Sequence, residues 1–305
     1  MTLSLRYLHL DVFTSTPLEG NQLAVFPEPP RDLTTDAMQR IAREMAFSES
    51  TFLFPPERGG DIRMRIFTPG EELPIAGHPT VGTAFALALE GTIASGRQEF
   101  VFELGVGPTP VSLQWKGNGL TFAWMTQPLP GFGPTLEARE VVAASLGVDR
   151  SDLADGVPVE VVSCGVPFLF VPLSTRAAVD RVAIDRRALM RAFDQAGTRE
   201  VTVFIFTMDR TGAKGDETVY SRMLAPGFGI GEDPATGSAS GPLGCYLFRH
   251  GMVDAGGARA VVSLQGVAMR RPSRIHIAID TSGDSVVRVR VGGQSVLMGS
   301  GTLTI

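Results

Sequence analysis

Three side chains that could carry a proton occur in unusual surroundings. His78 lies in "ELPIAGHPTVGTA" and Asp233 in "GEDPATGSASG", and aligning His-Pro-Thr-Val-Gly-Thr-Ala with Asp-Pro-Ala-Thr-Gly-Ser-Ala gives the same small-residue turn twice. Glu49, in "AFSESTFLF", is the third. Imidazole and carboxylate groups are common general acids and bases. The matched positions of the histidine and the aspartate predict a site, although each group has a structural alternative: a satisfied histidine, a helix N-cap or a solvent-facing glutamate.

Glu49 stands between Phe47 and Phe52, where an amphipathic segment gives way to an apolar strand. Apolar surroundings disfavour the charged carboxylate and would raise its pKa toward neutrality. A carboxyl group with such a pKa suits general-base catalysis.

Each doubled turn leads into a segment of small residues. A helix entered through Gly, Thr and Ser exposes its first backbone N–H groups, and the helix dipole makes that end partly positive. Two such helix starts that face one cleft could bind a carboxylate or a developing enolate. The alternative is that each turn only starts a core helix.

The elements that position these residues are short strands and a few helices. Runs such as "LHLDVF", "IRMRIF", "VTVFIF" and "VYSRML" are separated by Gly and Pro, which indicates a largely antiparallel sheet. In the first half, 34–46 is amphipathic after a Thr cap, whereas 78–89 is apolar on nearly every side and must be surrounded. The second half repeats this order, with "LEAREVVAASLG" as the outer helix and 236–250 as the apolar one.

This order of elements is a repeat at the scale of a domain. An Arg-x-x-x-Pro-Gly unit ends the strand before each apolar helix, at 65–70 and 222–227, and the separation is 157 residues at the Arg and 155 at the His/Asp turn. The repeat predicts an α+β fold of two pseudo-symmetric domains, each a curled, barrel-like sheet around a buried helix. The Pro- and Gly-rich "MTQPLPGFGPT" places the boundary between 1–127 and 128–305, and the last strand, about 296–305, could return to the first domain.

Composition excludes several classes of function. The 305 residues are 44% apolar and 19% charged, and the apolar runs stay below the ~18 residues of a membrane span. A net charge of -5 with dispersed basic residues argues against nucleic-acid binding. The four histidines show no metal spacing, and neither a Walker A motif nor a strand-linked GxGxxG occurs. We therefore expect no metal and no cofactor.

The N-terminus and the cysteines predict an intracellular setting. "MTLSLRYLHLDVF" alternates apolar and polar side chains as a strand does, unlike a signal peptide, so we expect the cytoplasm. Cys164 and Cys245 belong to no CxxC motif and lie in apolar surroundings. They are expected to be core residues.

The chain resembles the PhzF-like family of phenazine-biosynthesis-type isomerases and, more distantly, diaminopimelate epimerase. The resemblance is carried by "LDVFTSTPLEGNQLAVF", "MAFSESTFLF", "TPGEELPIAGHPTVGTA", "APGFGIGEDPATGSASG", "LQGVAMRRPSRIHI" and "VGGQSVLMGSG". These segments cover nearly the whole length in the family's order. The resemblance implies a diaminopimelate epimerase-like fold, an active site between two domains, a homodimer and a carbon-acid reaction without a cofactor.

The resemblance also implies roles for individual residues. Glu49 matches the family's acid/base glutamate, and Gly77 and Gly237 match glycines that supply N–H groups at the helix starts. The family's epimerase relatives carry a thiol at each turn, and this chain has none there, which excludes two-thiol racemisation. The substrate-contacting positions are matched by Asn21, His78, Asp233 and Ser238.

The expected function is a proton shift within a small carboxylate-bearing substrate. In this hypothesis Glu49 removes a proton from one carbon and returns it to another, while His78 and Asp233 orient polar groups or shuttle a second proton. Two alternatives stay open: an epimerase with Glu49 on one face and His78 or Asp233 on the other, and a binding protein that keeps the fold without turnover.

Overall fold

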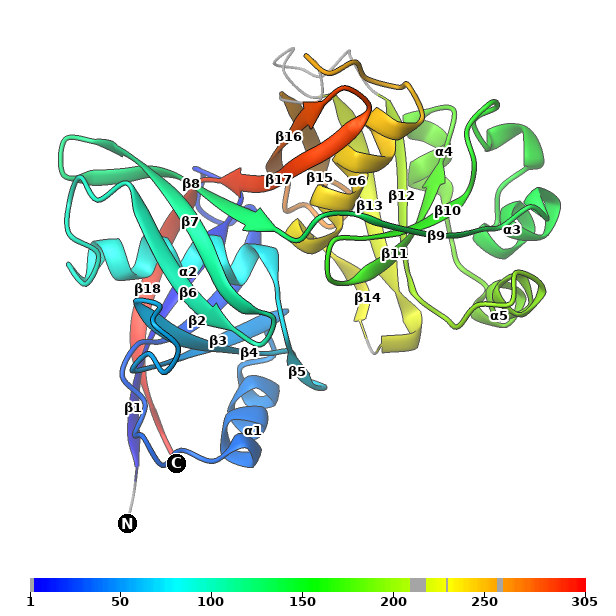
Figure 1. Cartoon of the computed structure of the whole chain (residues 1–305). Coiled ribbons are helices and arrows are strands. Elements are labelled where there is room, and N and C mark those ends of the chain that lie inside the picture. Colours follow the sequence, from blue (N-terminus) through cyan, green and yellow to red (C-terminus); the bar gives the residue numbers. More distant parts are fainter. Residues whose placement is uncertain (1–2, 209–217, 229, 257–259) are drawn as a thin grey trace. The chain divides into compact units, whose positions relative to one another are not determined.

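The computed structural model describes residues 3–208, 218–228, 230–256 and 260–305, and the chain forms two compact units (Figure 1). Unit 1 comprises Met1–Gln127 and Arg290–Ile305, and unit 2 comprises Pro128–Val289. The C-terminal strand thus belongs to the first unit, where it pairs with the N-terminal strand along its whole length.

Unit 1 is a curled sheet with one helix inside it and one on its other face. Its elements are β1 (Ser4–Val12), β2 (Asn21–Phe26), α1 (Thr35–Met45), β3 (Glu49–Phe54), β4 (Ile62–Phe67), β5 (Glu72–Leu73), α2 (Gly77–Leu89), β6 (Glu99–Leu104), β7 (Gly107–Lys116), β8 (Gly119–Gln127) and β18 (Ser295–Thr304).

The strands of unit 1 pair in a defined order. β1 lies between β18 and β2, and both are antiparallel to it. β2 is parallel to β3, and β3 is antiparallel to β4. β4 then pairs at one end with β6, in parallel, and at the other end with β5, antiparallel, while β6, β7 and β8 continue as a meander. The sheet therefore forks after β4.

The apolar helix α2 is the centre of unit 1. Its buried residues run from Gly77 to Leu87, as expected of a helix without a polar face. Gly82 is required there, because a Cβ atom would lie 2.6 Å from side-chain atoms of both Val12 and Leu23. The amphipathic α1 covers the other face and is capped by Thr34, whose hydroxyl accepts from the Ala37 N–H.

Unit 2 contains the following elements in chain order: β9 (Gly131–Thr135), α3 (Arg139–Leu146), a 3-10 turn at Arg150–Asp152, β10 (Glu160–Ser163), β11 (Pro167–Pro172), α4 (Arg176–Arg181), α5 (Arg186–Gln195), β12 (Thr202–Met208), β13 (Val219–Ala225), a 3-10 turn at Pro226–Phe228, β14 (Ile230–Asp233), α6 (Gly237–Arg249), β15 (Val261–Gln265), β16 (Ser273–Ser282) and β17 (Ser285–Gly293), which enters unit 1 at Arg290.

Unit 2 repeats the pairing order of unit 1. β10 lies between β9 and β11, β11 is parallel to β12, β12 is antiparallel to β13, and β13 pairs antiparallel with β14 and parallel with β15. α6 is the buried central helix, with Leu243, Cys245 and Tyr246 fully covered. The predicted architecture, a curled sheet around an apolar helix in each half, is confirmed.

The outer helix of unit 2 differs from the prediction. The segment "LEAREVVAASLG" does form α3, but α3 precedes β10, whereas α1 connects the parallel strands β2 and β3. The matching connection between β11 and β12 holds α4 and α5, two helices that were not predicted from the sequence. α5 is amphipathic and buries Leu189 and Phe193 in a cluster shared with α3 and α4. Two short helices thus do in unit 2 what α1 does in unit 1.

In the part of the chain that the structure describes, no helix has the length and apolar character needed to cross a membrane.

Candidate active site

Unit 1 gathers several predicted residues at one edge of its sheet. β2 and β3 run in parallel with Leu23 opposite Glu49, so their first residues lie at the same edge. Asn21 begins β2 and Glu49 begins β3. α2 starts nearby with Gly77 and His78, and the contacts of His78 bring these elements together.

The imidazole of His78 lies between Asn21 and Glu49. Its Nδ1 is 3.2 Å from Nδ2 of Asn21, and its Nε2 is 3.1 Å from Oε2 of Glu49. Only 3% of the His78 side chain and 13% of the Glu49 side chain are exposed. A substrate carbon does not fit between two atoms 3.1 Å apart, so these groups can act only from one side of a bound molecule.

Burial sets the protonation state of His78. It lowers the pKa of His78 to about 3, against a smaller opposing effect of the Gln22 backbone. The imidazole is therefore neutral at pH 7, with one nitrogen carrying a hydrogen and the other accepting. Nδ1 lies within hydrogen-bond distance of the Asn21 amide, whereas the approach of Nε2 to Oε2 of Glu49 is a close contact without hydrogen-bond geometry.

Phe52 does not line the carboxylate of Glu49, contrary to expectation. Successive side chains of a strand point to opposite faces. Thr51 points to α2, where its hydroxyl lies 3.1 Å from that of Thr83, and Glu49 shares this face. Phe52 points to the other face and packs with α1. Phe47 stacks on the imidazole of His9 in β1, with ring centroids 4.6 Å apart. The surroundings of Glu49 in unit 1 are the polar start of α2.

In unit 2 the predicted residues lie on the connection between β14 and α6. Asp233 is the last residue of β14, and Gly237 and Ser238 are the first two residues of α6. Asp233 is buried, and its Oδ2 accepts a hydrogen bond of 2.5 Å from the hydroxyl of Thr236. Thr236 is the N-cap residue of α6, yet its hydroxyl bonds the aspartate and no N–H group of the helix.

Gln265, the last residue of β15, completes this network. Its Oε1 accepts from the Thr236 N–H at 3.1 Å, and its Nε2 donates to the Asp233 carbonyl at 2.8 Å and to the Thr236 hydroxyl at 3.0 Å. Gln265 is fully buried. Neither Thr236 nor Gln265 was predicted from the sequence. A glutamine that ends an apolar strand was the available signal.

The structure corrects the alignment of the two turns. His78 is the second residue of α2, whereas Asp233 precedes α6, so the two do not occupy equivalent positions. The helix starts Gly77 and Gly237 are equivalent, and they are 160 positions apart. With this offset, "ELPIAGHPT" of unit 1 aligns with "EDPATGSAS" of unit 2, and His78 corresponds to Ser238.

Two matching hydrogen bonds support this offset. Thr80 and Ser240 each donate to the carbonyl of the N-cap residue of their helix, at 2.7 Å to Ala76 and 2.9 Å to Thr236. The sequence match of His78-Pro79 with Asp233-Pro234 favoured the wrong register. The first of these Pro residues lies inside α2 and the second lies before α6, a difference that the sequence motif does not reveal.

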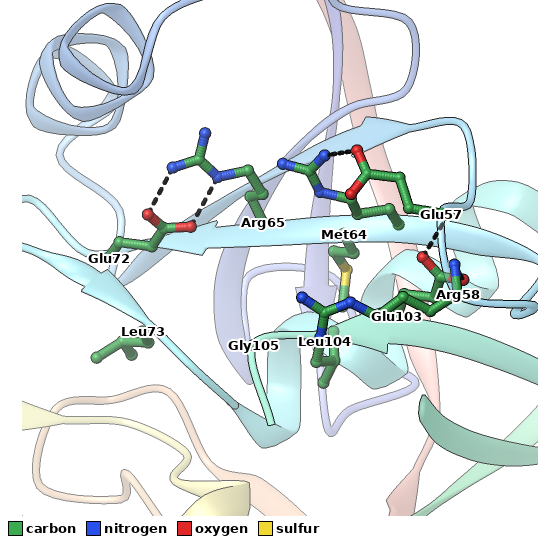
Figure 2. Close-up of a pocket in the computed structure, with 10 residues that line it drawn as sticks. Glu57, Arg58, Met64, Arg65, Glu72, Leu73, Glu103, Leu104 and Gly105 are labelled. Atoms are coloured by element: carbon green, nitrogen blue, oxygen red, sulfur yellow. Dashed lines mark hydrogen bonds and ion pairs between the residues drawn. The ribbon is translucent and has the colours of Figure 1, made fainter. Parts of the chain in front are cut away.

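Each connection is also fixed by an equivalent Arg–Glu pair. Arg65 of β4 binds Glu72 of β5 through Nε–Oε1 at 2.7 Å and Nη2–Oε2 at 2.6 Å, beside a cavity of ≈ 380 Å³ (Figure 2). Arg222 of β13 binds Glu232 of β14 in the same way, at 3.0 and 2.9 Å. A two-point contact holds both partners in one plane. Each pair therefore ties the strand just before the central helix to its neighbour.

The cysteines lie in the core of unit 2, as predicted. Cys164 and Cys245 are buried free thiols. A hydrogen bond with Cys245, together with burial, raises the pKa of the Cys164 thiol, which keeps it protonated. Among the described residues, no group of three His, Cys, Asp or Glu side chains is arranged to hold a metal ion.

The structure thus brings Asn21, Glu49, Gly77 and His78 together in unit 1, and Asp233 and the start of α6 together in unit 2. A common cleft for these two groups stays a prediction.

Comparison with known proteins supports an enzyme of isomerase type. The trans-2,3-dihydro-3-hydroxyanthranilate isomerase of Pseudomonas aeruginosa is 38% identical over 296 residues, which are 97% of this chain and 98% of that protein. A solved structure described as a predicted epimerase from P. aeruginosa is 35% identical, covers 98% of this chain and 99% of its own, and has a TM-score of 0.79. A PhzF-family phenazine biosynthesis protein from Bacillus anthracis, 25% identical, covers 99% and 100% with a TM-score of 0.86.

The fold and these relatives define the protein as an isomerase. Residues 10–301 match the PhzC-PhzF family, whose members are described as phenazine biosynthesis-like proteins. The chain belongs to this family, which confirms the resemblance inferred from the sequence.

Proposed function

We propose that the protein catalyses a cofactor-independent proton shift in trans-2,3-dihydro-3-hydroxyanthranilate or a closely similar cyclic amino acid. The support for this substrate is the 38% identity, over nearly the full length of both chains, to an isomerase of that name. The observation that carries the mechanism is the Glu49–His78 contact of 3.1 Å at the start of α2.

In this mechanism Glu49 is the acid and base. Its carboxylate takes a proton from a carbon made acidic by the conjugated system and becomes a carboxylic acid. It then returns the proton to another carbon of the same system, so a double bond moves and the molecular formula is unchanged. The neutral His78, whose Nε2 lies 3.1 Å from this carboxylate, limits its rotation.

Unit 2 supplies groups that bind the rest of the substrate. We propose that Asp233 and Ser238 contact its amino and hydroxyl groups, and that N–H groups at Gly77 and Gly237 bind its carboxylate, because helix starts attract anions. Asn21 contacts the substrate beside His78. The active enzyme is proposed to be a cytoplasmic homodimer in which residues of both units surround one substrate.

The test is incubation in D2O with trans-2,3-dihydro-3-hydroxyanthranilate, followed by NMR and ultraviolet absorbance. One positioned acid/base contributes on the order of 10²–10⁴ in rate, so Glu49→Gln should lower kcat by about that factor. Glu90→Gln is the matched control, since Glu90 lies at the opposite end of α2 and pairs with Arg6. Full activity of Glu49→Gln would contradict the proposal.

An epimerase is the second candidate, supported by the structure described as a predicted epimerase at 35% identity. Inversion with two bases needs one base on each face of a carbon. The 3.1 Å contact disfavours Glu49 and His78 as that pair, so Asp233 would have to be the second base. Deuterium at an inverted centre without a change in the ultraviolet spectrum would favour this candidate over the isomerase.

A further inference from the structure

In unit 2 the polar residues Asp233, Thr236 and Gln265 are buried at positions where unit 1 has apolar residues. The offset of 160 positions between the two helix starts gives the counterparts of Asp233 and Thr236 in unit 1, and strand pairing gives the counterpart of Gln265. Arg63 and Tyr220 both stand two residues before the Arg of the Arg–Glu pair, and they lie opposite Glu103 and Leu264. The next residues, Leu104 and Gln265, are therefore equivalent. The trio Asp233, Thr236 and Gln265 corresponds to Leu73, Ala76 and Leu104.

The surrounding backbone is the same in both units. The glycine after β6, Gly105, and the glycine after β15, Gly266, both approach the proline of the connection, because an added Cβ would lie 2.8 Å from Cα of Pro74 and 2.5 Å from the carbonyl oxygen of Pro234. Leu73 and Leu104 are among the residues that line the pocket of Figure 2, most of which are charged. Because unit 1 has leucines at the positions of Asp233 and Gln265, the fold does not require polar residues at these positions.

The hydrogen bonds of the trio have a single consistent direction. The Thr236 N–H can only donate and the Asp233 carbonyl can only accept, so the Gln265 amide must place Oε1 on the first and Nε2 on the second. Nε2 also donates to the Thr236 hydroxyl, which must then use its own hydrogen toward Oδ2 of Asp233. Oδ2 is thereby held as an acceptor. This bond favours Oδ1 as the oxygen that carries a proton when Asp233 is protonated.

We propose that Gln265 and Thr236 are positioning residues for Asp233. Gln265 orients the Thr236 hydroxyl, and this hydroxyl holds the carboxylate of Asp233 in one rotation, so only Oδ1 exchanges protons or hydrogen bonds with a substrate. This inference rests on the proposed role of Asp233 in substrate binding. It adds two buried residues that touch no substrate but determine which oxygen does.

The test compares two hydroxyls at the start of α6. Thr236→Val removes the hydroxyl that bonds Asp233. Ser240→Ala removes a buried hydroxyl that donates to the Thr236 carbonyl and lies outside this chain of bonds. Thr236→Ser restores the hydroxyl, and Gln265→Leu introduces the residue of unit 1 if Thr236→Val does not fold.

We expect Thr236→Val and Gln265→Leu to lower kcat for trans-2,3-dihydro-3-hydroxyanthranilate by up to about 100-fold, the cost of a misplaced group of about 1 Å. Thr236→Ser should recover most of the rate, and Ser240→Ala should leave it close to that of the native chain. Equal losses in Thr236→Val and Ser240→Ala would overturn the proposal.

A second readout does not depend on turnover. In protein with ¹³C-labelled aspartate, the Asp233 carboxyl resonance is identified by its loss in Asp233→Asn. It should shift in Thr236→Val and Gln265→Leu and stay in place in Ser240→Ala. An unmoved resonance in both variants overturns the positioning role. A shifted resonance in a protein that does not isomerise the substrate refutes only the proposed function.

Discussion

The starts of α2 and α6 share one backbone frame and carry different chemistry. In both, an Arg–Glu pair ties the preceding strand to its neighbour, a proline follows, and a hydroxyl in the helix donates back to the N-cap carbonyl. Unit 1 adds a histidine in contact with a glutamate, whereas unit 2 adds an aspartate held by a threonine and a glutamine. Backbone geometry has been kept between the repeats while the polar side chains have diverged.

The difference indicates a division of roles. A carboxylate beside a neutral imidazole can gain and lose a proton, because its partner can donate or accept. A carboxylate held on one oxygen by a directed hydrogen-bond chain keeps a fixed orientation. The first arrangement suits proton transfer and the second suits binding, as the proposed mechanism requires.

The two Arg–Glu pairs should contribute different amounts to the free energy of unfolding. Arg222 is about nine-tenths buried, and its Nη1 also donates to carbonyls at the end of α4, at 3.0 Å to Val179. Arg222→Met would leave Glu232 without its partner in a buried place and should cost about 3–5 kcal/mol. Arg65→Met should cost only about 1 kcal/mol, because Glu72 is 38% exposed and water replaces the pair.

Urea unfolding of both variants measures this difference. Glu72→Gln and Glu232→Gln serve as controls, since they remove the charge and keep the shape. Similar losses for Arg65→Met and Arg222→Met would show that the two pairs are equivalent and that the extra carbonyl contacts contribute nothing.

The polar pair in unit 2 should show a strong energetic coupling. Thr236→Ala alone removes the donor from a buried carboxylate, and Asp233→Leu alone removes the acceptor of a buried hydroxyl. The double variant, Asp233→Leu with Thr236→Ala, has the residue types that unit 1 has at these positions and keeps both hydrogen bonds of Gln265 to the backbone. Its loss in unfolding free energy should be smaller than the sum of the single losses by about 1–3 kcal/mol.

The four proteins of this cycle can be compared by urea unfolding at pH 7. Additive losses would mean that Thr236 and Asp233 do not depend on one another, which would also weaken the positioning role of Thr236.

The sequence predicted the fold better than it predicted the register of the repeat. The apolar helices at 78–89 and 236–250 were found within a residue or two, because a helix without a polar face has only one possible location. The pairing of His78 with Asp233 was wrong, since short turns rich in Pro and Gly match in several registers. Aligning Glu72 with Glu232, the glutamates of the two Arg–Glu pairs, gives the correct register. Which glutamate pairs with which arginine across two strands is not visible in the sequence alone.

For the site, Asn21, Glu49 and His78 were named from their types and from the resemblance, and they do lie together. Thr236 and Gln265 were missed because their importance lies in the direction of hydrogen bonds between residues about thirty positions apart, which requires coordinates. Phe52 was misplaced because it follows Glu49 by three positions in the same strand, and side chains an odd number of positions apart point to opposite faces of the sheet.

The smallest expected effect concerns the protonation of His78, which has no counterpart at Ser238. With its pKa lowered to about 3 in the folded chain and near 6.5 when unfolded, His78 binds a proton more readily in the unfolded state between these values. Its contribution to stability is thus complete above pH 6.5 and is lost as the pH falls toward 3. Between pH 6.5 and 5 this amounts to about 1–2 kcal/mol.

His78→Gln should therefore flatten the pH dependence of the unfolding free energy in this window, where most carboxylates remain ionised. Urea unfolding at pH 7.5, 6.5, 5.5 and 5.0 for both proteins provides the measurement. Parallel curves would mean that His78 has the same pKa in the folded and unfolded chain, whereas a native chain that gains stability relative to His78→Gln as the pH falls from 7.5 to 6.5 would mean that Glu49 holds His78 in its charged form. The histidine would then be an imidazolium paired with a carboxylate, and unit 1 would hold its acid/base group by charge, which would weaken the contrast with the directed hydrogen bonds of unit 2.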